Sequence, residues 1–117
     1  MSTLEQGAHA EAMAAQHLES QGYQIIERNY RCRAGEIDLI ASDGGVLCFV
    51  EVRSRTDDGI DPFETITHAK RKRIIEAAKN YLDGLTPWPS EMRFDAIGIV
   101  LKDPPSVELR RGAFEVE

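Results

Sequence analysis

Apolar residues recur along the chain with two different periods, and the change of period divides the sequence into helical and strand-like segments. From Thr3 to Gln21 they return every three or four positions, which predicts an amphipathic helix ended by Gly22. The predicted inner stripe of this helix consists of Leu4, Ala8, Ala12, Ala15 and Leu18. Glu11 falls on the same stripe, so its carboxylate is predicted to face the interior, unlike those of Glu5 and Glu19.

A second helical period follows the dipeptide Asp61-Pro62 and runs to about Leu82. Proline is tolerated in the first turn of a helix, and an aspartate before it can cap the first free N–H groups. The predicted inner face consists of Ile66, Ile74, Ala77, Ala78 and Tyr81. The preceding segment, Thr56 to Pro62, is polar and is predicted to be a loop.

Five segments have the alternating period of strands. They run from Tyr23 to Arg31, from about Glu36 to Ser42, from Val46 to Ser54, from Met92 to Leu101 and from Val107 to Arg111. The resulting order α-β-β-β-α-β-β predicts an α/β fold, in which a mixed central sheet of about five strands has a helix on each side.

The segment Ser42 to Gly45 is a strong hairpin signal, and it sets how the second and third strands pair. A two-residue loop starting at Asp43, or a four-residue loop, places Asp38 opposite Phe49. Glu51 is then the diagonal neighbour of Asp38 on the same face, roughly 7 Å away between Cα atoms. A three-residue loop would instead put the two carboxylates on opposite faces of the sheet.

Asp38 and Glu51 therefore place two carboxylates in otherwise apolar strands. Burying an unpaired carboxylate is costly, because burial strips the hydration of the charged form. Two of them on neighbouring strands are most simply explained if they share a cation, and Mg²⁺ is typically held by one or two carboxylates. With Glu11 as a third carboxylate, direct or through water, the pattern predicts a magnesium or manganese site.

Structural alternatives stay open for these residues. Asp38 could form an ion pair with Arg53, which lies on the same strand face. Glu51 could likewise pair with Arg55, because structural networks also perturb carboxylates. Glu36 is either a secondary ligand or a strand-end charge. Arginine cannot act as a base, so Arg53 is predicted to hold a phosphate and stabilise developing negative charge, or else to be a salt-bridge partner.

The composition is that of an ordinary globular protein, since 42% of the 117 residues are hydrophobic and 29% are charged. This length suits a single domain over residues 1–117. No apolar run approaches the roughly 20 residues that span a bilayer, and the first residues lack the basic start and apolar block of a secretory signal. Cys32 and Cys48 lack metal-binding spacing, so both are predicted to be free thiols of a cytoplasmic protein.

The net charge of −6 argues against general coating of nucleic acid, which depends on neutralising phosphates. The distribution of charge matters more than its sum. Four of the 14 basic residues form the run Lys70-Arg71-Lys72-Arg73, which follows the polar loop. A solvated helix face is one interpretation of this run. The other is phosphate contact, predicted for Arg55, Lys70 and Arg73, with Lys70 best placed because it leans toward the inner face.

In these motifs the chain resembles the YraN-type uncharacterised bacterial protein family, a group similar to PD-(D/E)xK nucleases and archaeal Holliday-junction resolvases. The matching segments are Gly35-Glu36-Ile37-Asp38-Leu39-Ile40, the ExK-type strand Phe49-Val50-Glu51-Val52-Arg53-Ser54-Arg55, and the late strand Arg93-Phe94-Asp95. The resemblance implies a restriction-endonuclease-like fold and a metal-ligand role for Glu11, Asp38 and Glu51. It places Arg53 at the lysine position of the wider nuclease pattern.

We therefore expect a Mg²⁺- or Mn²⁺-dependent endonuclease that hydrolyses DNA, on branched or structured forms in repair or recombination. Its expected catalytic residues are Glu11, Asp38, Glu51 and Arg53. The alternative is a non-catalytic nucleic-acid-binding or adaptor module that retains the nuclease fold, which the arginine at position 53 and the acidic net charge favour. Resolvase-like relatives act as dimers, so the resemblance also implies a homodimer whose two sites cut opposed strands.

Overall fold

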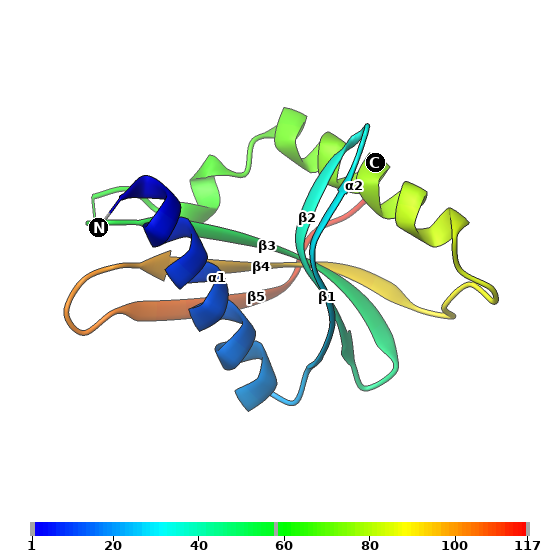
Figure 1. Ribbon diagram of the computed structural model, residues 1–117, viewed down its shortest axis with the longest axis horizontal. Coiled ribbons are helices and arrows are strands. Elements are labelled where there is room, and N and C mark those ends of the chain that lie inside the picture. The colour runs from blue at the N-terminus through cyan, green and yellow to red at the C-terminus, as the bar shows by residue number, and fades with distance from the viewer. Residues whose placement is uncertain (1, 58, 117) are drawn as a thin grey trace.

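The computed structural model describes residues 2–57 and 59–116, so one residue of the predicted loop Thr56 to Pro62 lies outside the described residues. Its elements are α1 (Thr3–Ser20), β1 (Gln24–Cys32), β2 (Gly35–Asp43), β3 (Val46–Arg55), the 3₁₀ turn η1 (Pro62–Thr65), α2 (His68–Asp83), β4 (Met92–Val100) and β5 (Ser106–Phe114). The strands form one sheet in the order β1-β2-β3-β4-β5. β3 and β4 run parallel, and the other neighbouring pairs are antiparallel. The predicted α/β fold and element order are confirmed (Figure 1).

The first helix packs on the sheet with a face that differs from the predicted one. α1 begins after Ser2, whose side-chain oxygen accepts a hydrogen bond from the N–H of Glu5. Its buried residues are Ala10, Ala14, Ala15 and Leu18, whereas the predicted inner residues Leu4, Ala8 and Ala12 are exposed. Alanine stands at positions 8, 10, 12, 14 and 15, so small apolar residues surround this helix and the pattern does not fix its rotation. Glu11 still lies beside the buried face, because positions three and four apart are neighbours on a helix.

The second predicted helix is divided in two. The Asp61 side chain accepts from the N–H of Phe63 and caps the short turn η1, which ends at Thr65. α2 starts afresh after Thr67, whose hydroxyl oxygen accepts from the N–H of Lys70. A prediction of one continuous helix is therefore wrong, because two capping side chains within seven positions each begin a separate element. Within the described residues, neither α1 nor α2 is both long and apolar enough to cross a membrane.

The hairpin between β2 and β3 turns at Gly44 and Gly45. Both glycines have positive φ, 57° and 92°, as the favoured two-residue hairpin turn requires. Asp43 therefore pairs with Val46, and the predicted register is wrong by two residues. A shift of two leaves each side chain on its face. The recorded pairs end with Leu39 and Val50, so the next positions across the two strands are those of Asp38 and Glu51.

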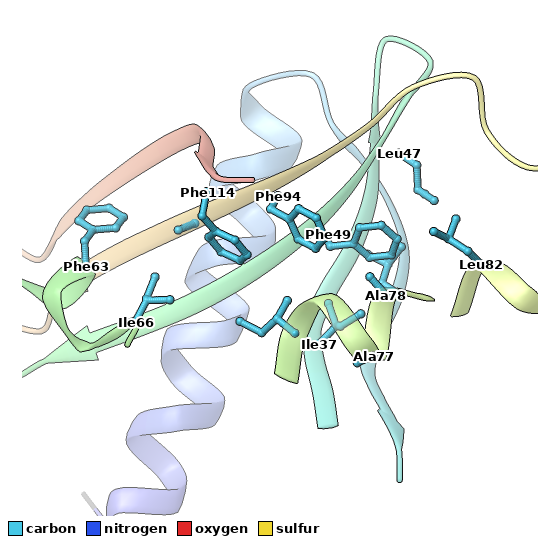
Figure 2. Close-up of a cluster of buried hydrophobic side chains, with 13 residues drawn as sticks. Ile37, Leu47, Phe49, Phe63, Ile66, Ala77, Ala78, Leu82, Phe94 and Phe114 are labelled. Atoms are coloured by element: carbon cyan, nitrogen blue, oxygen red, sulfur yellow. The ribbon is translucent and has the colours of Figure 1, made fainter. Parts of the chain in front are cut away.

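Two apolar layers cover the two faces of the sheet. On the face of α2, aromatic residues from β3, β4 and β5 form the centre of one cluster with Ile74, Ala77 and Ala78 (Figure 2). Phe49 and Phe94 are in contact there, with ring centroids 5.5 Å apart. On the other face, the small residues of α1 pack on alternate positions of β2 to β4. The two layers leave the start of β2 and the end of β3 as the place where polar groups enter the sheet.

A buried ion pair in β4 connects the sheet to the β2–β3 hairpin. Asp95 of β4 is fully buried and accepts hydrogen bonds from Arg93, the Tyr23 hydroxyl and the N–H of Gly112. Arg93 also donates to Asp43 at the β2–β3 hairpin, at 2.7 Å. Arg93 and Asp95, which belong to the late-strand motif, thus link the α1–β1 corner, a hairpin and β5. Their contacts are structural.

Candidate functional site

The site lies where the ladder between β2 and β3 opens. Asp38 Oδ2 accepts a hydrogen bond of 2.8 Å from the backbone N–H of Val52. The side chain thereby satisfies an N–H group beyond the last recorded strand pair. On the neighbouring strand β1, Asn29 has a left-handed backbone with φ of 54°, which asparagine tolerates better than most residues. The regular alternation of the sheet is interrupted here, and the Asp38 carboxylate occupies the opening.

Glu51 supplies a second carboxylate, which is buried with 4% exposure. Its Oε2 atom has no hydrogen-bond partner among the described residues. Lys70 Nζ, which arrives from α2, lies 3.6 Å from this oxygen, within the range of an ion pair but beyond a good hydrogen bond. A carboxylate with an unsatisfied buried oxygen and one nearby ammonium is incompletely compensated.

The two carboxylates are coupled. The pKa of Asp38 is raised to about 8, first by burial and then by a hydrogen bond to Glu51 and the negative charge of that neighbour. The Val52 N–H and the Lys70 ammonium oppose this rise in pKa without cancelling it. A carboxyl group that keeps its proton at neutral pH beside a second carboxylate marks a place where a cation can replace that proton.

Glu11 lies in a groove of about 600 Å³ between α1 and the β1–β2 hairpin, and Asp38 lines the same groove. Burial and the nearby negative charge of Asp38 raise the pKa of Glu11, while a hydrogen bond from Asn29 lowers it. Glu51 sits behind this groove, on the side of Lys70. In residues 2–57 and 59–116, no three acidic, histidine or cysteine side chains lie close enough to hold one metal ion together. The structure thus brings Asp38 to Glu51, with Glu11 as a neighbour of Asp38.

The two arginines that follow Glu51 on β3 have different partners from the ones weighed as ion pairs. Arg53 Nε donates to the Thr65 hydroxyl at 2.6 Å, and that hydroxyl donates to the Pro62 carbonyl. The side chain of Arg53 is therefore tied to η1. Arg55 Nε is buried without a hydrogen-bond partner among the described residues. Lys70, rather than Arg55, is the cation recorded beside Glu51.

Arg73, the last predicted phosphate contact, is exposed on α2 one turn after Lys70. Both residues line a second groove, which lies between α2 and the β1–β2 hairpin. Glu36, which was weighed as a secondary ligand, is half exposed and forms a surface ion pair of 3.4 Å with Arg31.

Three contributors to the site are missing from the sequence-based prediction. They are Asn29, the Val52 N–H and Thr65. Asn29 carried a detectable signal, because an asparagine inside a strand segment is unusual and is suited to a left-handed backbone. A backbone N–H has no signal in the sequence. Thr65 had none either, because its partner Arg53 is fixed only by the packing of η1.

This fold and geometry define a class of small α/β proteins in which a mixed sheet, with one helix on each face, carries a coupled carboxylate pair where two strands separate. Residues 10–99 match the uncharacterised protein family UPF0102, and the chain belongs to this family. It is 52% identical over 96 residues to a UPF0102 protein of Chlorobaculum parvum, with 80% of this chain and 74% of the relative covered. It is 38% identical over 114 residues to one of Clostridium kluyveri, covering 94% and 93%. The family resemblance is confirmed.

Proposed function

We propose that the protein is a Mg²⁺- or Mn²⁺-dependent endonuclease that hydrolyses phosphodiester bonds of branched or otherwise structured DNA. The observation that carries this proposal is the coupled pair of Asp38 and Glu51 at the opening of the ladder. A fold gains no stability from an uncompensated buried carboxylate, so the pair is better explained by chemistry than by structure. The resemblance to PD-(D/E)xK nucleases supports phosphodiester hydrolysis as the class of reaction.

The residues fit a hard divalent cation. Carboxylate oxygens are the ligands that Mg²⁺ and Mn²⁺ prefer. The buried Oε2 atom of Glu51 accepts no hydrogen bond from the described residues and could coordinate such an ion. Asp38 and Glu51 would hold the ion, and Glu11 would contribute from the adjoining groove, through water. When bound, such an ion supplies a nucleophilic water at neutral pH and neutralises charge on the phosphate.

The cations of the site have separate tasks in this proposal. Lys70 lies beside Glu51 and is partly exposed, so its ammonium can contact a phosphate oxygen and orient it toward the carboxylates. Arg53 cannot accept a proton, and its bond to Thr65 holds the guanidinium beside η1. There it can bind a phosphate as a fixed charge. Arg73 is exposed on α2 and Arg55 is half-buried at the end of β3, and both would add positive charge near the site.

The nuclease proposal is tested with labelled four-way, flapped, nicked and linear DNA in Mg²⁺ or Mn²⁺. We expect Asp38→Asn and Glu51→Gln each to reduce cleavage by about 100-fold or more, because several kcal/mol of charge stabilisation would be lost. Glu36→Gln removes an exposed carboxylate from the same hairpin and should keep most of the activity. Absence of cutting on every substrate, or equal cutting by the two carboxylate variants, would disprove the proposal.

A second candidate function is a non-catalytic nucleic-acid-binding or adaptor module. The arginine at position 53 and the net charge of −6 favour it. Calorimetric titration with Mg²⁺ and Mn²⁺ separates the two candidates. The nuclease requires binding that Asp38→Asn abolishes, whereas the adaptor requires neither metal binding nor sensitivity to that substitution. Sedimentation of the free protein and of its DNA complex tests the homodimer that two opposed cuts would need.

A further inference from the structure

A second groove borders the carboxylate site on the side of α2. It has a volume of about 290 Å³ and lies between α2 and the tip of the β1–β2 hairpin, which stands beside that helix (Figure 1). Its walls include Arg31, Gly35 and Glu36 from the hairpin and Lys70 and Arg73 from α2. Since the ammonium of Lys70 also lies 3.6 Å from Glu51, one end of the groove reaches the carboxylate pair.

Close packing fixes the relation between the two walls. A Cβ atom added to Gly35 would lie 3.0 Å from the carbonyl oxygen of Arg73 and 3.3 Å from its Cβ. Only a glycine lets the hairpin backbone approach α2 this closely. The groove is therefore preorganised, and its basic side chains project from backbone that is held in place.

The cations of this groove are only partly compensated. Arg73 of its α2 wall is exposed, as is Arg33 at the adjoining hairpin tip outside the lining, and neither forms an ion pair within the part of the chain that the structure describes. Arg31 pairs with Glu36 only at the surface, where such pairs are weak. The groove on the α1 side differs, since its charged lining consists of Glu11, Glu36 and Asp38 with Arg31 alone as a cation. In a chain of net charge −6, three cations thus line the groove on one side of the site, Arg31, Lys70 and Arg73, with Arg33 at the adjoining hairpin tip.

We infer that the groove between the β1–β2 hairpin and α2 binds the phosphodiester backbone of a nucleic acid and leads it to the carboxylate pair. This inference rests on the proposed function, which it deepens by giving the substrate a side of approach. Lys70 and Arg73 contact phosphates from the wall of the groove, and Arg33 contacts one from the adjoining hairpin tip, so binding depends on the backbone and carries no base sequence.

Binding is measured by fluorescence anisotropy with a labelled flap DNA, which contains duplex, single strand and a branch in one molecule. EDTA is present, so cleavage plays no part. We expect the double variant Arg33→Glu/Arg73→Glu to weaken binding by about tenfold or more at low salt. The slope of log K against log salt, which is negative, should become less steep by about 2, because two phosphate contacts are lost. Both side chains are exposed, and circular dichroism checks that the fold is retained.

The matched control is Lys72→Glu/Lys79→Glu, which changes the net charge equally on the same helix but outside this groove. It should weaken binding much less and leave the slope nearly unchanged. Equal effects of the two double variants would overturn the inference, as would competition by poly-glutamate as strong as that by DNA at equal charge. If no DNA is cleaved but the Arg33/Arg73 variant weakens binding as expected, the nuclease proposal is wrong and the groove inference stands. If DNA is cleaved but this variant binds like the control, the groove inference is wrong and the nuclease proposal stands.

Discussion

Asp38 shows how a single buried carboxyl group can lower the stability of a fold. The charged form of Asp38 is stabilised by a hydrogen bond from the Val52 N–H and by the positive charge of Lys70. Burial and the negative charge of Glu51 oppose its ionisation. The carboxyl group therefore holds its proton more tightly in the folded protein than in the unfolded chain. A purely structural acid would show the reverse, as Asp95 does.

Asp38→Asn should consequently stabilise the protein at neutral and alkaline pH. The pKa of Asp38 is near 8 in the fold and near its ordinary 3.8 when unfolded. Between these values only the folded state keeps the proton, so wild-type stability falls as pH rises toward 8. Asparagine accepts from Val52 and donates to Glu51 without taking up a proton. We expect a gain in the free energy of unfolding of about 1 kcal/mol or more at pH 8, since one pKa unit corresponds to about 1.4 kcal/mol.

Urea unfolding at pH 5 and pH 8 measures this effect. The gain should shrink toward the lower pH, where wild-type Asp38 already carries its proton. Glu36→Gln, at an exposed position on the same strand, serves as the control. A loss of stability in Asp38→Asn at both pH values would assign Asp38 a structural role.

At the scale of elements, the site depends on two hairpins and the start of α2. The Gly44-Gly45 turn fixes the register that brings Asp38 to Glu51, and the Thr67 cap starts α2 where Lys70 can reach Glu51. The approach of the β1–β2 hairpin to α2 depends in turn on Gly35. The position at which each of these elements begins or turns therefore determines which side chain lies in the site.

Gly35→Ala tests the packing of the hairpin on α2. The new Cβ would crowd the Arg73 carbonyl and force the hairpin tip outward. We expect a loss of stability of about 1–2 kcal/mol, typical of overpacking, and several-fold weaker binding of flap DNA. Thermal unfolding and anisotropy measure the two effects. Gly7→Ala is the control, because a Cβ at that exposed helical position meets no atom within 4 Å. Unchanged DNA binding in Gly35→Ala would contradict the role given to the groove.

The sequence predicts most elements and the acidic pair, because strand alternation and hairpin signals are local. Asp38 and Glu51 still come to opposing positions of β2 and β3 although the predicted register is off by two residues, but the interrupted alternation turns Asp38 toward the groove beside α1 and leaves Glu51 on the side of Lys70. The rotation of α1 and the division of the second helix were mispredicted. Alanines on every side of α1 leave its buried face undefined, and the helical period after Asp61 does not show that the Asp61 and Thr67 caps begin two separate elements. Lys70 reaches Glu51 through packing, so its distance could not be foreseen.

At the scale of the whole molecule, one sheet carries two sets of buried polar groups. The first is Asp38 with Glu51. The second centres on Asp95, which pairs with Val50 one row from Glu51, and whose pKa is lowered because hydrogen bonds from Arg93, Gly112 and Tyr23 outweigh its burial. The second set joins Tyr23, the β2–β3 hairpin and β5 through hydrogen bonds. Its stabilising contribution to folding opposes the destabilising burial of Asp38 and Glu51.

Asp95→Asn should destabilise the protein by about 2–4 kcal/mol, because it leaves the Arg93 guanidinium partly buried without its main partner. The pKa of Asp95 is depressed in the fold, so its contribution is present above the unfolded pKa and is lost as pH falls through the folded value. The difference between variant and wild type should accordingly narrow in acid. Urea unfolding from pH 3 to pH 7 measures it. Asp43→Asn, at the more exposed end of the same network, should cost about 1 kcal/mol or less, and an equal loss would contradict this account.

Arg31 and Glu36 line both grooves, so the two cavities share a single wall that is one β-hairpin thick. The contact of Gly35 with Arg73 holds this wall against α2. Loosening that one contact would therefore alter the space beside Glu11 as well as the space beside Arg73.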